Sequence, residues 1–101
     1  MLTFEKVMEI FSDYLEADRD LELILTSRGY LRILWSHNGF DYEDGALCRT
    51  PDELFDVLLA DCESFHHVQA THGMRELTQE DQEQAKAKCQ VYIDRRQAIE
   101  H

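Results

Sequence analysis

A cysteine and three histidines lie close together between positions 62 and 72, and these side chains suit metal binding. Cys62 and His66 are four residues apart, which places both on one face of a helix, and His67 and His72 follow them. A zinc site needs three or four such ligands, and no second pair of cysteines or histidines occurs at short spacing. A metal-binding protein using Cys62 and His66 is therefore one hypothesis. The other is that Cys62 fills the core and that the histidines favour the C-terminal end of the helix.

The other two cysteines, Cys48 and Cys89, are distant from this segment, so their approach to it would depend on the fold. Three widely spaced cysteines do not form a disulfide framework. The first residues are charged and lack the apolar region of a signal peptide, and no apolar run approaches the ~20 residues of a membrane span. We therefore predict a cytoplasmic protein with reduced thiols and no membrane contact.

Acidic residues are the second chemical feature, because the chain has 21 acidic and 10 basic residues and a net charge of −11. The acids concentrate in residues 1–63, which hold 15 acidic and 5 basic residues. Three of them recur at helical i, i+4 spacing near the N-terminus, and three more extend the patch: Glu5, Glu9, Asp13, Glu16, Asp18 and Asp20. This acidic face predicts a binding surface for a basic protein partner, and the alternative is a solvated face that keeps the protein in solution.

The large negative charge also argues against binding to other anionic molecules. A strongly acidic surface repels nucleic acid and anionic membranes, so we expect no direct nucleic-acid binding. The sequence has no Gly-rich phosphate loop, no nucleophile elbow, and no histidine with a serine or cysteine at motif spacing. The acidic loop 41–45 lacks the glycine spacing of a calcium loop. We therefore predict a non-catalytic protein without a cofactor.

The elements that must position these residues begin with a helix and a hairpin. Apolar residues at helical spacing predict an amphipathic helix over 3–17 with Thr3 as its N-cap. Alternating apolar residues predict strands over 21–26 and 31–35, and Asn38-Gly39 predicts a type I′ turn after them. Phe40, Tyr42 and the segment 46–48 predict a short third strand at an edge of the sheet, interrupted by a turn at 43–45.

Two capped helices follow the strands. Thr50-Pro51-Asp52-Glu53 is a capping box with proline at the first helical position, and it predicts a helix from Pro51 to about His72 with Gly73 after its end. Thr78, with Asp81 three residues later, predicts the start of the last helix. The apolar stripe of that helix is thin and consists of Ala85, Cys89, Tyr92 or Ile93, and Ile99. A helix this polar lies on the surface, projects, or pairs with a second chain, so a homodimer is one prediction.

Together these elements predict one α+β domain over residues 1–101 in the order α-β-β-β-α-α. We expect a three-stranded antiparallel sheet with the helices packed on one face. The order α-β-β-β-α resembles that of a double-stranded-RNA-binding domain. However, Asp52, Glu53 and Asp56 stand where the last helix of such a domain has residues that contact phosphate, which argues against RNA binding.

Four short segments resemble a family of short uncharacterised acidic proteins from gut bacteria, often carried on mobile elements. The segments are Phe4-Glu5-Lys6-Val7, Gly29-Tyr30, Cys48-Arg49-Thr50-Pro51 and Leu77-Thr78-Gln79-Glu80. This resemblance spans nearly the whole chain, consists of caps and turns, and implies no activity. Element order and acidity are also similar to those of small anti-CRISPR inhibitors that mimic DNA, although no motif is shared.

The leading hypothesis from sequence is an interaction or regulatory protein whose acidic face binds a basic protein. The first alternative is a DNA mimic that inhibits a nucleic-acid-binding protein, because DNA and an acidic surface compete for the same basic groove. The second is the metal-binding protein described above.

Overall fold

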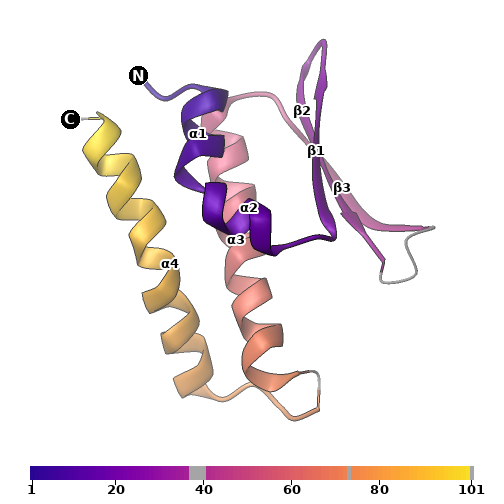
Figure 1. Ribbon diagram of the computed structural model, residues 1–101, viewed down its shortest axis with the longest axis vertical. Helices are drawn as coiled ribbons and strands as arrows, with labels where there is room; N and C mark the ends of the chain where they lie inside the picture. The colour runs from indigo at the N-terminus through magenta and orange to yellow at the C-terminus, as the bar shows by residue number, and fades with distance from the viewer. Residues whose placement is uncertain (37–40, 73, 101) are drawn as a thin grey trace.

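The elements follow the predicted order, with the first helix in two pieces. The structure is a computed structural model that describes residues 1–36, 41–72 and 74–100. In chain order the elements are α1 (Phe4–Ile10), α2 (Ser12–Ala17), β1 (Leu21–Thr26), β2 (Gly29–Trp35), β3 (Tyr42–Cys48), α3 (Pro51–Thr71) and α4 (Gln79–Glu100) (Figure 1). The fold is α+β, with a three-stranded antiparallel sheet in the order β1-β2-β3, as predicted.

The single helix predicted over 3–17 is wrong in one respect, because regular helix is interrupted at Phe11. Thr3 caps α1 as expected, and its hydroxyl accepts a hydrogen bond from the Lys6 N–H at 3.2 Å. Phe11 has φ −97° and ψ 15°, outside the helical range. Its ring is fully buried and lies 5.3 Å from the ring of Phe55 on α3 and 4.6 Å from that of Tyr92 on α4. Packing of this ring against two other helices overrides the local helical pattern.

The third strand is also longer than predicted. Residues 43–45 do not form a turn, and β3 runs without interruption from Tyr42 to Cys48 at the edge of the sheet. Asp44 pairs with Leu34, and its carboxylate accepts hydrogen bonds from Arg32 Nη1 at 3.1 Å and from the Gly45 N–H at 2.9 Å. A register irregularity between Leu34 and Trp35 accommodates the segment. The predicted Asn38-Gly39 turn lies outside the described residues.

The two long helices begin at their predicted caps. The Thr50 hydroxyl accepts from the Glu53 N–H at 3.1 Å, while the Glu53 carboxylate reaches the Arg49 N–H at 2.8 Å rather than that of Thr50. Thr78 and Asp81 form a complete capping box with reciprocal bonds of 3.0 and 3.1 Å. Helix α3 ends at Thr71 and is capped by His72, a residue with φ 52°, and the predicted Gly73 is outside the described residues.

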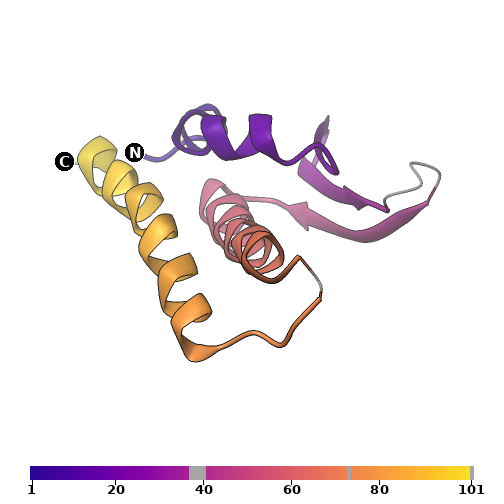
Figure 2. The ribbon, with the colours of Figure 1, turned by 60° about the horizontal axis from the view of Figure 1, so that its bottom comes forward.

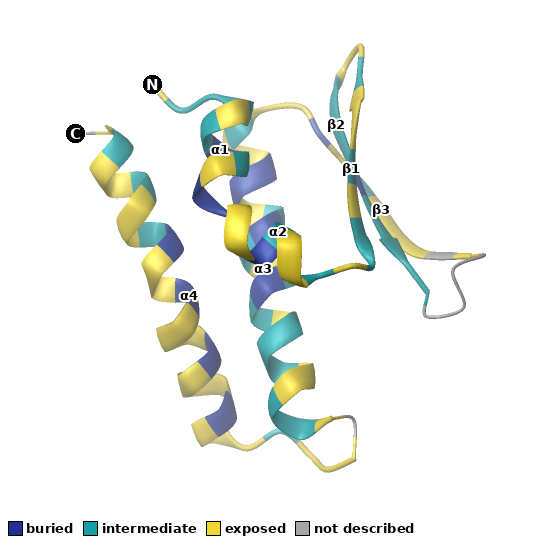
Figure 3. Cartoon of the chain, viewed as in Figure 1, coloured by how far each residue is buried: buried dark blue, intermediate teal, exposed yellow. Residues whose placement is uncertain are grey.

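All four helices lie on one side of the sheet, and α4 packs on α3 and α1 away from it (Figures 1 and 2). The fully buried side chains come chiefly from the helices, so most of the core lies between them. Helix α4 buries one narrow stripe, consisting of Asp81, Ala85, Cys89 and Tyr92, and exposes the rest (Figure 3). Helix α4 therefore lies on the surface, which is one of the three alternatives predicted for it, and its buried stripe packs against α3.

No helix in the described part of the chain combines the length and the apolar character needed to cross a membrane.

Gly29, at the start of β2, is the position where the backbone requires glycine. Its φ is +135°, and a Cβ atom there would lie 2.3 Å from the carbonyl oxygen of Cys48. Gly45, on β3, has no such constraint, since a Cβ atom would lie 3.9 Å from its nearest neighbour, the Arg32 carbonyl oxygen.

These two glycines give a matched test of the sheet. We expect Gly29→Ala to lower the free energy of unfolding by at least about 1–3 kcal/mol, since an alanine at this φ is strained and also meets the backbone of β3. Gly45→Ala should be neutral or stabilise by about 0.5 kcal/mol, because alanine restricts the unfolded chain. Urea unfolding measures both, and equal effects would contradict the assigned backbone at Gly29.

Candidate functional site

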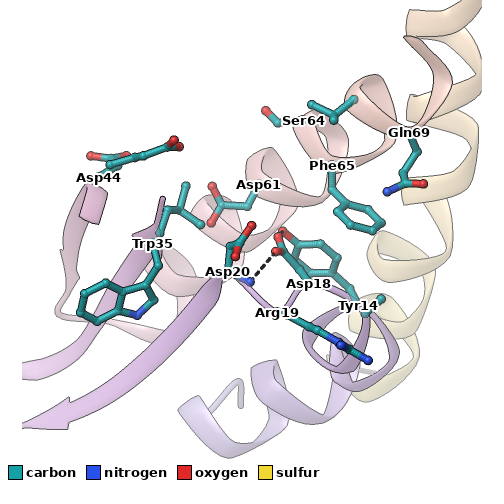
Figure 4. A pocket seen from close by; sticks show the side chains of 14 residues that line it. Tyr14, Asp18, Arg19, Asp20, Trp35, Asp44, Asp61, Ser64, Phe65 and Gln69 are labelled. Carbon is teal, nitrogen blue, oxygen red and sulfur yellow. Dashed lines mark hydrogen bonds between the residues drawn. The ribbon is translucent and has the colours of Figure 1, made fainter. Parts of the chain in front are cut away.

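A groove of about 580 Å³ opens between the α2–β1 connection, the ends of β2 and β3, and α3. Its lining combines acidic, aromatic and apolar side chains, drawn in Figure 4: Tyr14, Ala17, Asp18, Arg19, Asp20, Leu34, Trp35, Glu43, Asp44, Asp61, Ser64, Phe65, Val68 and Gln69. We refer to these residues as the acidic groove. Five carboxylates line it, and among the described lining residues Arg19 is the single cationic one.

The middle of the acidic groove is formed by Asp18, Asp20 and Asp61, between Trp35 on one side and the rings of Tyr14 and Phe65 on the other (Figure 4). Asp18 is fixed by two hydrogen bonds: Oδ2 accepts from the Tyr14 hydroxyl at 2.7 Å and Oδ1 from the Asp20 N–H at 3.2 Å. The rings of Tyr14 and Phe65 meet edge to face at 5.7 Å. The groove is thus held by contacts between α2, α3 and the connection before β1.

Asp61 lies at the floor of the groove and forms an ion pair with Arg32 from β2. Arg32 Nε and Asp61 Oδ2 are 3.1 Å apart, and the two side chains are only 7% and 10% exposed. Neither atom has a hydrogen-bond partner, because the orientation of the N–H does not suit the carboxylate. Arg32 Nη1 instead bonds Asp44, which is 61% exposed. Asp61 Oδ2 is therefore held against Arg32 by charge attraction and is shielded from solvent.

The electrostatic setting of Asp61 opposes its negative charge. Burial raises the pKa of this carboxyl to about 6, the Arg32 guanidinium counteracts the rise, and the charges of Asp18 and Asp44 add to it. No histidine is among the described lining residues. A cation entering the groove would stabilise ionised Asp61 and release its proton.

The predicted acidic face is divided by the fold. Asp18 and Asp20 line the acidic groove, whereas the other four residues lie on the exposed sides of α1 and α2. Glu9 and Asp13 line a separate cleft of about 450 Å³ beside the end of α4. There Arg95 Nη1 donates to Asp13 at 3.2 Å. Burial opposes ionisation of Asp13, but its hydrogen bonds, foremost that with Arg95, outweigh it and lower the pKa. Glu5 and Glu16 are exposed and line neither cavity.

The predicted metal ligands are elsewhere, on the side of α3 that faces α4. Cys62 is fully buried and His66 is half-buried, and Cys89 of α4 joins them. His67 and His72 are not part of this cluster, since His72 is exposed at the end of the helix. The sequence spacing predicted Cys62 and His66 as candidate ligands, but only the packing of α4 on α3 shows that Cys89 lies beside them.

Sequence reasoning missed Arg32, Asp61, Glu43 and Asp44 as residues of one site. Arg32 alternates with apolar residues in β2, and Asp61 lies between the apolar positions of α3. The available signal was a charged residue among the apolar positions of each element. The ion pair between the two residues is evident only from the register Leu23↔Arg32↔Ala46, which places Arg32 on the sheet face toward the helices.

No protein-family model matches the chain, and no curated protein or solved structure is significantly similar to it. Function must therefore be inferred from the groove and the chemistry of its residues.

The buried ion pair gives a test of how the sheet is held to α3. We expect Arg32→Met to lower the free energy of unfolding by about 3–5 kcal/mol at neutral pH, because Asp61 then remains charged, buried and unpaired. Its pKa in the folded state would rise further, so the folded chain would hold a proton that the unfolded chain releases. The loss should therefore shrink as the pH falls from about 8 to about 5.

The control is the double substitution Arg32→Met with Asp61→Leu, which removes both charges and should recover most of the stability at every pH. Urea unfolding at several pH values measures all three proteins. A deficit for Arg32→Met that is independent of pH would show that Asp61 does not depend on Arg32.

Proposed function

We propose that this protein is a non-catalytic interaction domain that binds a basic segment of a partner protein in the acidic groove. The observation that carries the proposal is the convergence of five carboxylates and an aromatic wall in one groove, where Arg19 is the single cation among the described lining residues. Repulsion among these carboxylates is relieved when a lysine or arginine side chain enters. Asp61 adds a carboxylate that is only 10% exposed, and its negative charge attracts the cationic group at short range.

The apolar lining supports the same class of ligand. Lysine and arginine carry aliphatic stems that pack on apolar surface while the charged end reaches a carboxylate. Trp35 and Phe65, which are half-buried, provide rings to which a guanidinium or ammonium group is also attracted. A short basic peptide segment satisfies both parts of the groove. We propose that it belongs to a cytoplasmic protein, since the three cysteines are free thiols.

Binding can be followed directly, because Trp35 is the only tryptophan of the chain and lines the groove. Peptides rich in lysine or arginine should change its fluorescence with saturation, and an acidic peptide of the same length should not. The double variant Asp20→Asn with Glu43→Gln should weaken binding about 5- to 30-fold, since each exposed charge contact contributes about 0.5–1 kcal/mol.

The matched control is Glu5→Gln with Glu16→Gln, which removes two exposed charges away from the groove. Equal weakening in both variants would mean that binding follows net charge alone. Weakening in Glu9→Lys with Asp13→Lys but not in the groove variant would place binding on the outer face of α1 and α2. That result would favour the DNA-mimic hypothesis, and competition with DNA for a basic protein would then test it.

The pH dependence gives an independent test of Asp61. Because its pKa is about 6, Asp61 is ionised at about pH 7.5 and largely protonated at about pH 5, so peptide affinity should fall several-fold over this interval. Asp61→Asn should bind more weakly at pH 7.5 and lose most of the dependence. Fluorescence titration at both pH values measures this, with circular dichroism to confirm that the variant is folded. An unchanged profile in Asp61→Asn would remove this residue from the binding site.

A further inference from the structure

Three metal-binding side chains meet where α4 packs on α3, on the face of α3 next to the one that lines the acidic groove. Cys62 and His66 are one helical turn apart on α3, and Cys89 comes from α4. The two Sγ atoms and an imidazole nitrogen all lie within 4.8 Å of one another. Both cysteines are almost wholly buried, at 0% and 1% exposure, while His66 is half-buried and leads to the surface.

The spacing of the three atoms is close to that of a tetrahedral metal site. Zn–S bonds of about 2.3 Å and Zn–N bonds of about 2.0 Å place ligand atoms roughly 3.5–3.8 Å apart around the ion. The present separations exceed this by about 1 Å at most, a distance that small side-chain rotations supply. Three protein ligands leave a fourth position for water beside half-buried His66.

Burial affects all three side chains. It lowers the pKa of His66, and the charges of Lys88 and His67 lower it further. Burial also raises the pKa of both thiols, that of Cys62 to about 12, so a metal ion has to displace a proton from each sulfur. The two sulfurs already lie within 4.8 Å of each other.

The surrounding interface shows what such an ion would do. Helix α4 is polar on most of its surface, and besides Cys89 its buried stripe consists of Asp81, Ala85 and Tyr92. Alanine and cysteine bury less apolar area than larger side chains, so a metal ion between Cys62 and Cys89 would add to the packing that Tyr92 makes on Phe11. We propose that Cys62, His66 and Cys89 bind a thiophilic cation of the zinc type, which fastens α4 to α3.

The test uses the reduced full-length chain with Zn²⁺ and Co²⁺ as probes. We expect one equivalent of Zn²⁺ to bind in competition with a chelator and to raise the melting temperature. Co²⁺ should give the sulfur-to-cobalt charge-transfer band and the intense visible bands of a tetrahedral thiolate site. Absence of the charge-transfer band, or zinc binding without any change in melting temperature, would overturn the proposal. The proposal would also be overturned if Cys62 and Cys89 formed a disulfide that persists in reductant and prevents zinc binding.

Two matched pairs of variants assign the ligands. His66→Gln should weaken Zn²⁺ binding at least about tenfold, since even partners outside the coordination shell are worth that much, whereas His67→Gln should not. Cys89→Ala should abolish the charge-transfer band, whereas Cys48→Ala, at a buried cysteine outside the cluster, should keep it. If Cys89→Ala does not fold, the histidine pair still decides, because both histidines are partly exposed. Equal affinities in His66→Gln and His67→Gln would overturn the site.

Discussion

The ion pair between Arg32 and Asp61 joins the two halves of this molecule. It connects the central strand to the central helix at a place where both side chains are almost fully buried. Asp61 of this pair also lines the acidic groove, so the contact that holds the sheet to α3 also affects the charge that Asp61 offers there. Arg32 neutralises part of the charge of Asp61 and also bonds Asp44. The groove therefore stays negative, while the buried charge of Asp61 has a partner.

Helix α3 links the two candidate sites by presenting different faces to different neighbours. Asp61 and Phe65 face the sheet and α2, whereas Cys62 and His66 face α4. A basic segment in the groove and a metal ion in the seam would therefore contact the same two turns of one helix on neighbouring faces. Each would restrict that helix, and each would make the other's binding surface more rigid.

Local features of the fold could be predicted from sequence, and features that depend on packing could not. The caps at Thr3, Thr50 and Thr78 set helix starts because each involves residues only a few positions apart. The break at Phe11 depends on rings from two distant helices. The same distinction explains β3, where Asp44 and Gly45 have the composition of a turn but are held in the sheet by Arg32.

The candidate site followed the same rule. Asp18 and Asp20 were predicted as part of an acidic face, and the fold places them in a groove with Glu43 and Asp61 from other elements. Alternation in β2 indicated a strand, but it did not show that the buried face carries Arg32. Charge pairs between a strand and a helix have no fixed sequence spacing, so no pattern along the chain could reveal them.

The place of Phe11 in the core has a consequence for how the chain folds during synthesis. Its ring lies between α3 and α4, and Arg95 Nη1 donates to the Ile10 carbonyl at 2.8 Å across 85 residues of sequence. Helix α1 therefore lacks part of its packing until α4, which comes much later in the chain, has also been synthesised. The hairpin of β1 and β2, which needs only nearby residues, can form much earlier. Closure of the core then waits for α4, and α1 keeps part of its apolar face open to chaperones until that helix arrives.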